Sequence, residues 1–178
     1  MVHAEIAARE GIRADREVTE EEIASLQASS EIIFARRSAL AFLSRAPHTR
    51  KGLIVKLKKK GFGAAAIRLA ADRMTELGYL DDRSFAANWV RARLDSGREG
   101  WKALLKGLIQ RGVPRGIADE IVSEACTDEV ELEKARALVE GLTPKKTAAR
   151  LIARGFRSRT IGRILRDRGG PEIGEEEA

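Results

Sequence analysis

The chain has 178 residues, of which 43% are hydrophobic and only 4% aromatic, and its formal net charge is +6. Its single cysteine excludes an intramolecular disulfide, and the lack of a long apolar run argues against a membrane span. A core this poor in aromatic residues suits closely packed helices better than a β-sandwich. We therefore expect a cytoplasmic, helical protein with no membrane partner.

The charges are distributed unevenly along the chain. Residues 1–30 hold three basic and seven acidic residues, and residues 171–178 hold four acidic residues and no basic one. The stretch between them, 31–170, holds 30 basic and 16 acidic residues, a net charge of +14. This pattern predicts a negatively charged partner, either nucleic acid or an acidic protein surface, with plain solubility as the alternative explanation.

The N-terminal region, residues 1–35, is expected to be an extension that is only partly ordered. Its first 18 residues mix charges without an apolar period, which is typical of disorder or of a frayed helix. Thr19 and Glu22 then form a capping-box pattern, which predicts a helix from about residue 20. Whether this helix breaks near Ser29 or continues into the next region stays open.

A short pattern then recurs three times: a leucine, a basic residue, a glycine, a large apolar residue and, about a turn and a half later, an isoleucine. The copies are Leu57–Phe62 with Gly61 and Phe62, Leu108–Val113 with Gly112, and Leu151–Phe156 with Gly155. Glycine after an apolar run is a helix C-cap signal, because glycine enters the left-handed conformation at little cost. The basic residue before it would lie at the negative end of the helix dipole. Each copy therefore predicts a helix, a sharp corner and a second helix.

A further helical pattern precedes each copy, so the repeating unit is three helices of roughly 45 residues. It begins with Ala39, Ala86 and Ala135, each followed three and four residues later by large apolar residues. We place repeat one at residues 36–80, repeat two at 81–126 and repeat three at 127–168. An acidic tail, 169–178, is expected to be disordered.

Capping residues mark where the helices of these repeats should begin. The expected caps or first residues are Thr49, Asp81 or Asp82, Pro114, Thr143 with Pro144, and Ser158. Trp89 is assigned to the core together with Phe62 and Phe156. On the second helix of repeat three, Leu151 and Ile152 are expected to point inward.

The sequence offers little that could support catalysis. The two histidines, His3 and His48, are far apart, and no Cys/His set has the spacing of zinc ligands. Asp81 and Asp82 are adjacent carboxylates, but capping explains them better than metal binding because no further ligand lies nearby. We expect no enzymatic activity, no cofactor and no metal.

One segment between repeats one and two resembles the signature of the RecX family, the regulatory proteins that act on the bacterial recombinase RecA. Its residues are Gly78, Tyr79, Leu80, Asp81 and Asp82, followed by Phe85. With Gly61 and Phe62 upstream and Gly112 downstream, the resemblance extends over about residues 36–168. The chain departs from the family where Gly52 and Gly107 replace a usual Glu, and where Trp101 replaces a frequent Pro.

The resemblance implies an all-α fold: an elongated, curved array of three tandem three-helix repeats, which we expect to be a monomer. It also implies that the protein binds in the groove of the RecA filament on single-stranded DNA and inhibits ATP hydrolysis and strand exchange there. Such a protein would be a non-enzymatic regulator of homologous recombination and DNA repair. Some family members also bind DNA directly.

Exposed basic residues are the candidates for contact with such a filament or with DNA. They are Lys56, Lys59, Lys60, Arg93, Lys106, Arg111, Arg150 and Arg154. Each has a plainer explanation as a solvated residue, or as one that complements a helix dipole at positions 60, 111 and 154. Two alternatives to a filament regulator stay open: a helical protein that binds DNA directly, and an enzyme whose site is formed by residues distant in sequence.

Overall fold

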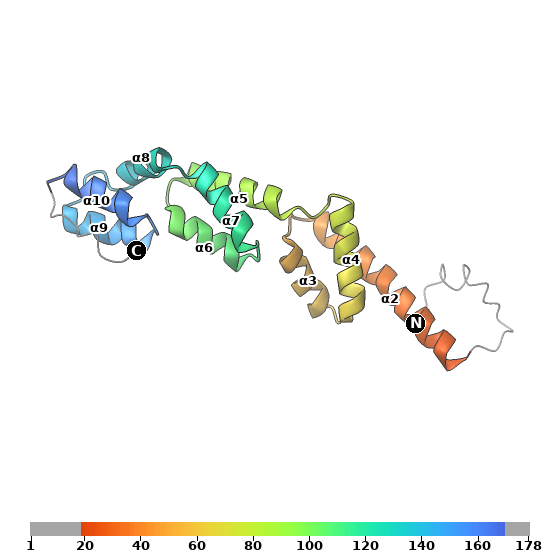
Figure 1. Ribbon diagram of the computed structural model, residues 1–178. Helices are drawn as coiled ribbons and strands as arrows, with labels where there is room; N and C mark the ends of the chain where they lie inside the picture. The colour runs from red at the N-terminus through yellow and green to blue at the C-terminus, as the bar shows by residue number, and fades with distance from the viewer. Residues whose placement is uncertain (1–18, 170–178) are drawn as a thin grey trace. The chain divides into compact units, whose positions relative to one another are not determined.

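The computed structural model describes residues 19–169, which form nine α-helices and no strand (Figure 1). The chain divides between Asp81 and Asp82 into two compact units, called unit 1 and unit 2 below. The all-α prediction is therefore confirmed for the described residues. The disorder expected for the first 18 residues and for the acidic tail, 169–178, concerns residues outside this range, apart from Gly169.

The first helix in the described part of unit 1 is the long helix α2 (Glu20–Leu43). The Thr19 hydroxyl accepts a hydrogen bond from the Glu22 amide at 3.2 Å, and the Thr19 amide donates to the Glu22 carboxylate at 3.0 Å. This confirms the capping box. Because no Gly or Pro interrupts α2, the helix runs through Ser29 without a break, and the boundary expected at residue 35 falls inside it.

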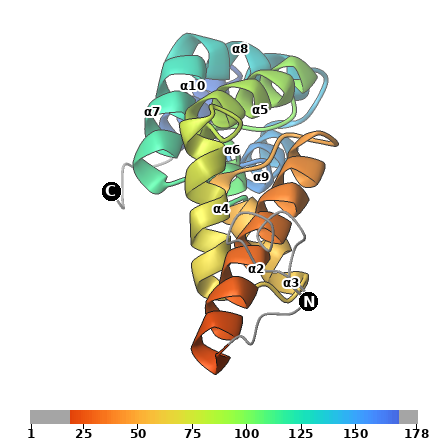
Figure 2. The same ribbon diagram turned by 90° about the vertical axis from the view of Figure 1, so that its right-hand side faces the viewer.

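The other helices of unit 1 are α3 (Arg50–Lys59) and α4 (Ala64–Glu76). Figure 2 shows α2 and α4 running side by side, and α3 packs against both. Their core includes the wholly buried Leu53 and Leu57. Thr49 caps α3 as expected, since its hydroxyl accepts the Gly52 amide at 3.0 Å.

Residues 82–169 of unit 2 form six helices. They are α5 (Asp82–Ser96), α6 (Trp101–Gln110), α7 (Arg115–Ala125), α8 (Asp128–Leu138), α9 (Pro144–Ala153) and α10 (Ser158–Arg166). In Figure 1 the helices α5, α6 and α7 form one group and α8, α9 and α10 form another. One core joins the first group around Val90 and Leu104, and another joins the second around Leu151 and Phe156. Each group of three helices therefore has its own buried centre.

The three predicted corners are present. Gly61, Gly112 and Gly155 have φ of 88°, 89° and 72°, and each follows a basic C-cap residue. The apolar residue after each glycine bonds back to the helix: the Phe62 amide reaches the Leu57 carbonyl at 3.4 Å, and the Phe156 amide reaches the Leu151 carbonyl at 3.1 Å. This is the Schellman arrangement, which satisfies carbonyls at the helix end.

The repeat pattern is one turn out of register in the first copy. The wholly buried pairs are Ala35 and Ala39 on α2, Ala86 and Val90 on α5, and Ala135 of α8 with Val139, the C-cap of that helix. Ala35, rather than Ala39, therefore corresponds to Ala86. Because α2 carries alanine at both turns, the sequence pattern alone could not distinguish them.

Some predicted helix starts and side-chain directions are wrong. Pro114 is the N-cap of α7 instead of its first residue. Ser158 is the first residue of α10 and Arg157 is its N-cap, because a buried carboxylate from α8 already accepts the Arg157 amide. Ile152 is 64% exposed, whereas Leu151 beside it is buried. Trp89 is only half-buried and packs at the edge of its core.

Candidate binding surfaces

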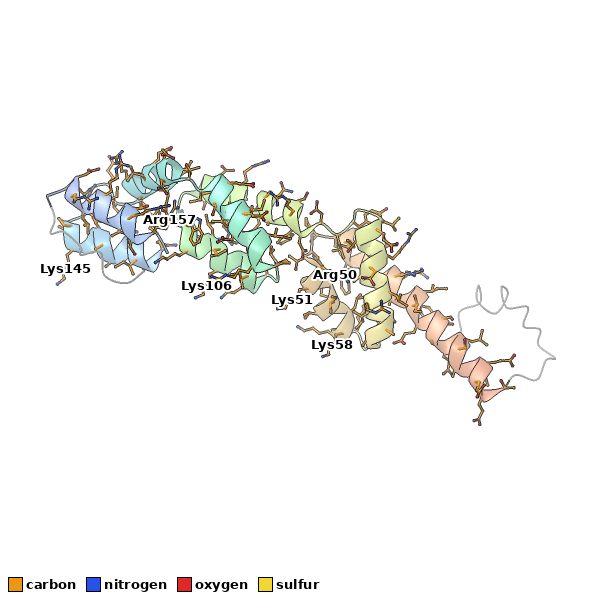
Figure 3. All side chains as sticks on the ribbon, in the orientation of Figure 1. Arg50, Lys51, Lys58, Lys106, Lys145 and Arg157 are labelled. Atoms are coloured by element: carbon orange, nitrogen blue, oxygen red, sulfur yellow. The ribbon has the colours of Figure 1, made fainter. Side chains whose placement is uncertain are left out.

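In unit 1 the candidates Lys56 and Lys59 lie on α3, which carries no acidic residue, and Lys60 is its C-cap. The ammonium groups of Lys56 and Lys60 lie 5.2 and 5.3 Å from the ring centroid of Phe42. Lys60 also donates to the Ser38 hydroxyl at 3.4 Å. Lys59 is exposed and pairs with no carboxylate among the described residues. Figure 3 shows Lys51 and Lys58 projecting from the same helix, so α3 presents a dense row of positive charge.

In unit 2 three of the predicted residues meet in an open groove of about 490 Å³ between α6 and α9, with α5 at one side. We call it the α6–α9 groove. Its charged and large apolar lining consists of Trp89, Arg93, Glu99, Lys102, Lys106, Arg111 and Ile152. Lys106 projects from α6 (Figure 3). The groove is therefore basic, with an apolar patch on its α9 wall.

Two guanidinium groups contact the Trp89 ring in this groove. The central carbon of Arg111 lies 4.6 Å from the ring centroid, and that of Arg93 lies 5.1 Å away, within the range of cation–π attraction. Arg93 is also paired with the Glu99 carboxylate at 3.1 Å, and Arg111 donates to the Gly107 carbonyl at 2.9 Å. Both arginines are thus held in place.

Gly107 is required by this arrangement. A Cβ atom at Gly107 would lie 2.4 Å from Cη2 of Trp89, too close for any real contact. The departure from the usual Glu noted in the sequence therefore has a local cause: Trp89 occupies the space over α6 that a side chain at residue 107 would need.

Gly107→Ala is expected to displace the indole of Trp89 and break its contacts with Arg93 and Arg111. Because Trp89 is only half-buried, its ring can move, and we expect a stability loss of about 1 kcal/mol. In a Trp101→Phe background, where Trp89 is the sole indole, its fluorescence should change clearly. Gly116→Ala is the control, since nothing lies within 4 Å of its added Cβ. Unchanged Trp89 emission in Gly107→Ala would contradict this packing.

The groove lies where the two helix groups of unit 2 join, and Glu131 of α8 is the centre of that junction. Its side chain is wholly buried and accepts four hydrogen bonds. The donors are the Trp101 amide at 2.8 Å, the Arg157 amide at 3.1 Å, the Arg157 Nε at 2.7 Å and the Thr160 hydroxyl at 2.7 Å. The two amides belong to the N-termini of α6 and α10, where a negative charge is stabilised by the helix dipoles.

These bonds determine the ionisation of Glu131. Burial by itself would raise the pKa of this carboxyl, but hydrogen bonds from Thr160, Trp101 and Arg157 outweigh it and lower the pKa below its usual value. The carboxylate is therefore charged at neutral pH. Nearby, burial raises the pKa of the Cys126 thiol to about 11, with a further contribution from Glu131, so this thiol is protonated and a poor nucleophile.

Close backbone contacts hold the same junction together. The Gly100 amide donates to the Arg154 carbonyl at 2.9 Å, and the Lys102 amide donates to the Gly155 carbonyl at 2.9 Å. A Cβ on Gly100 would lie 2.4 Å from the Phe156 Cα, and one on Gly155 would lie 2.6 Å from the Ala103 nitrogen. Only glycine fits at these two positions.

The remaining predicted residues lie apart from the groove lining. Arg150 and Arg154 are exposed at the end of α9 and have no side-chain partner in the described part of the chain. Of the signature residues, Leu80 is buried, Tyr79 is 58% exposed and Gly78 has φ of 75°. Sequence reasoning missed Lys102, which is four residues before Lys106. It also missed Glu131, whose signal was an acidic residue one turn before the buried Ala135.

The structure offers no metal site within residues 19–169, where no group of three His, Cys, Asp or Glu side chains converges. None of the helices in that range is long and apolar enough to cross a bilayer. His48 lies in the turn before α3, with Nδ1 2.6 Å from the Pro47 carbonyl. The described surface thus presents exposed basic residues and a basic groove.

Comparison with known proteins assigns the chain to a family. Models of the first and second three-helix domains of RecX match residues 35–74 and 81–125. The regulatory protein RecX of Chlorobium phaeobacteroides is 35% identical over 133 residues, which cover 71% of this chain and 88% of that protein. The regulatory protein RecX of Prosthecochloris aestuarii is 34% identical over 137 residues, covering 74% and 91%. The chain belongs to the RecX family, which confirms the resemblance seen in its sequence.

Two solved structures share the fold. RecX from Lactobacillus salivarius superposes with a TM-score of 0.73 at 23% identity and covers 78% of this chain and 97% of its own. A second regulatory protein RecX gives a TM-score of 0.76 at 20% identity, covering 93% and 88%. At these identities the likeness concerns the fold alone.

Proposed function

We propose that this protein regulates homologous recombination and DNA repair by binding the filament that RecA forms on single-stranded DNA. Bound there, it lowers ATP hydrolysis and strand exchange without catalysing a reaction of its own. The observation that supports this most directly is membership in a family of regulatory proteins, combined with exposed cations that have no carboxylate partner among residues 19–169. Among the predicted contact residues, the cations of this kind are Lys56, Lys59, Lys106, Arg150 and Arg154.

The proposal includes the finer fold. Three three-helix repeats, each with its own core, stack into an elongated, curved array whose basic residues contact several filament subunits. An array of this kind presents a long surface in place of a deep cleft, which suits a repeating partner. The protein acts as a cytoplasmic monomer in this proposal, because a RecA filament supplies the repeated binding sites itself.

The decisive experiment measures RecA-dependent ATP hydrolysis on single-stranded DNA at increasing concentrations of this protein. We expect the rate to fall in a saturable way. An unchanged rate at concentrations well above that of RecA would reject the proposal. Assays of the protein without RecA should give no ATPase or nuclease rate above background after rigorous purification; a rate that co-purifies would revive an enzymatic function.

Direct DNA binding is the second candidate, favoured by the row of basic residues on α3. Binding to phosphates releases counterions, so affinity for bare DNA should fall steeply with salt concentration. Tight binding to bare single-stranded DNA at physiological salt, together with an unchanged RecA ATPase rate, would favour this function over the first.

Reversing the charge at Lys56, Lys59 and Arg150 together, each to Glu, is expected to weaken inhibition of the RecA ATPase by about tenfold or more. The physical reason is that like charges then face the acidic partner. Thermal unfolding should change little, because all three side chains are exposed and form no ion pair within the described residues. The contact of Lys56 with the Phe42 ring is a weak one at this exposed position. An inhibition curve identical to that of the native protein would remove these residues from the contact surface.

A matched variant controls for net charge. Arg36, Arg91 and Arg115 are also exposed and form no ion pair with another described residue. Their replacement by Glu changes the net charge by the same amount. We expect it to leave inhibition within about twofold of the native protein, because none of the three is a predicted contact residue and exposed charges outside a contact are screened by salt.

A further inference from the structure

The α6–α9 groove combines features that a general basic surface does not have. Lys102 and Lys106 are exposed, lie one turn apart on α6 and form no ion pair or side-chain hydrogen bond within the described part of the chain. Ile152, on the opposite wall, is 64% exposed. The groove thus presents two unpaired ammonium groups on one wall and an aliphatic side chain on the other.

These features fit a peptide better than a nucleic acid. A base that stacked on Trp89 would have to displace Arg93 or Arg111, which already contact the ring. A phosphate backbone offers Ile152 no apolar surface to pack against. The negative charge of the Glu99 carboxylate in the groove also repels phosphate groups. A peptide can pair with the lysines on one wall and pack against Ile152 on the other, because it carries charged and apolar side chains on the same chain.

The spacing specifies the peptide. Residues four apart on a helix lie about 6 Å from each other. In an extended chain, side chains two residues apart point the same way at a separation of about 6.6 Å, and the residue between them points to the other side. A Glu–aliphatic–Glu sequence would therefore place its carboxylates against Lys102 and Lys106 and its aliphatic side chain against Ile152.

We propose that the α6–α9 groove binds an extended acidic segment of a partner protein with carboxylates on alternate residues and an aliphatic residue between them. This rests on the proposed function in one respect: the segment would belong to the protein component of the filament and not to its DNA. Arg93 and Arg111, held on Trp89, form the basic end of the groove, and Glu99 limits how far a second acidic group can enter.

The groove contains its own fluorescent probe. The chain has two tryptophans, Trp89 and Trp101, so a Trp101→Phe variant leaves Trp89 as the sole indole. Three probes are titrated into this variant: a peptide of two Glu-Ile-Glu units, the same peptide with Ser in place of Ile, and an oligothymidylate. We expect saturable perturbation of Trp89 emission by the first peptide, and about fivefold weaker binding of the serine peptide, because it loses the apolar contact.

Substitutions then locate the binding. Lys102→Glu with Lys106→Glu should weaken binding of the isoleucine peptide by about tenfold or more, since two attractive charge pairs become repulsive. Ile152→Ser should bring the affinity for the isoleucine peptide down to that for the serine peptide. Lys51→Glu with Lys58→Glu, on α3 of unit 1, is the control and should change nothing (Figure 3).

Three outcomes would overturn the proposal: no saturable binding of the isoleucine peptide, tighter binding of oligothymidylate than of that peptide, or equal affinity for both peptides. The peptide titration contains no RecA, so its result is independent of the RecA ATPase assay that tests the proposed function. Inhibition of the RecA ATPase with no peptide binding would reject the groove proposal alone. Peptide binding without inhibition would reject the proposed function and leave the groove assignment standing.

Discussion

Glu131→Ala is expected to destabilise unit 2 by about 3–5 kcal/mol, the usual cost of removing one partner from a buried ion pair. The substitution leaves the Arg157 guanidinium without its buried carboxylate and the Trp101 and Arg157 amides without an acceptor. The Trp101 amide belongs to α6 and the Arg157 amide to α10, so each of the two helix groups of unit 2 loses a hydrogen bond to the junction. Thermal unfolding measured by circular dichroism would report the loss.

Two further variants make this prediction specific. Glu131→Gln keeps the shape and two acceptor sites, so we expect a smaller loss of about 1–3 kcal/mol. Glu133→Ala, on the same helix but 77% exposed, is expected to cost less than about 0.5 kcal/mol. Equal unfolding temperatures for Glu131→Ala and Glu133→Ala would show that the buried carboxylate does not hold the junction.

The stabilisation by Glu131 should depend on pH in one direction. Its pKa is lowered in the folded protein, so its contribution is complete above the pKa of an unfolded Glu, about 4.3, and is lost as pH falls through the lower folded value. The difference in unfolding free energy between the native protein and Glu131→Gln should therefore be constant near neutral pH and shrink below about pH 4. A difference that grows on acidification would contradict the assignment.

Gly155→Ala should destabilise unit 2 by about 3 kcal/mol or more, because two costs combine. The residue has φ of 72°, a conformation that a Cβ disfavours. Its Cβ would also lie 2.6 Å from the Ala103 nitrogen and 2.8 Å from the Ala103 Cβ, so α6 and the corner after α9 would have to separate. Urea unfolding of the intact chain would measure the loss.

The chain supplies controls that separate the two costs. Gly61 has φ of 88° with nothing within 4 Å of an added Cβ, so Gly61→Ala should show backbone strain alone, about 1–2 kcal/mol. Gly100 has φ of −89° but meets the Phe156 Cα at 2.4 Å, so Gly100→Ala should show crowding alone, about 1–3 kcal/mol. If Gly155→Ala costs no more than Gly61→Ala, the close approach of α6 is not a constraint.

Local signals in the sequence were sufficient for the helices and their corners. The Thr19 capping box, the Thr49 cap and the glycines after Lys60, Arg111 and Arg154 all lie where the patterns indicated. These features depend on hydrogen bonds within a few residues, so the surrounding fold hardly alters them. The predicted start of α10 was wrong because it depends on a contact distant in sequence: the acceptor for the Arg157 amide is Glu131, 26 residues away.

Only part of the candidate site could be predicted from the sequence. Composition and charge singled out Lys106 and Arg111, but not which cations would share a groove or which would be isolated. Ile152 was assigned to the core because it follows Leu151 in an apolar run, yet packing between α9 and its neighbours leaves it on the surface. Helical periodicity cannot choose between two adjacent apolar residues when both lie near the edge of the buried face.

By itself the sequence determined the helical class, the three glycine corners and the family, because caps, left-handed glycines and motif residues act through neighbours in the chain. Only the tertiary structure decided that Glu131 joins the N-termini of α6 and α10, and that Lys102, Lys106 and Ile152 line one groove. Those contacts join residues that are distant in sequence, and they form because burial and hydrogen bonding at the junction bring two helix groups against each other.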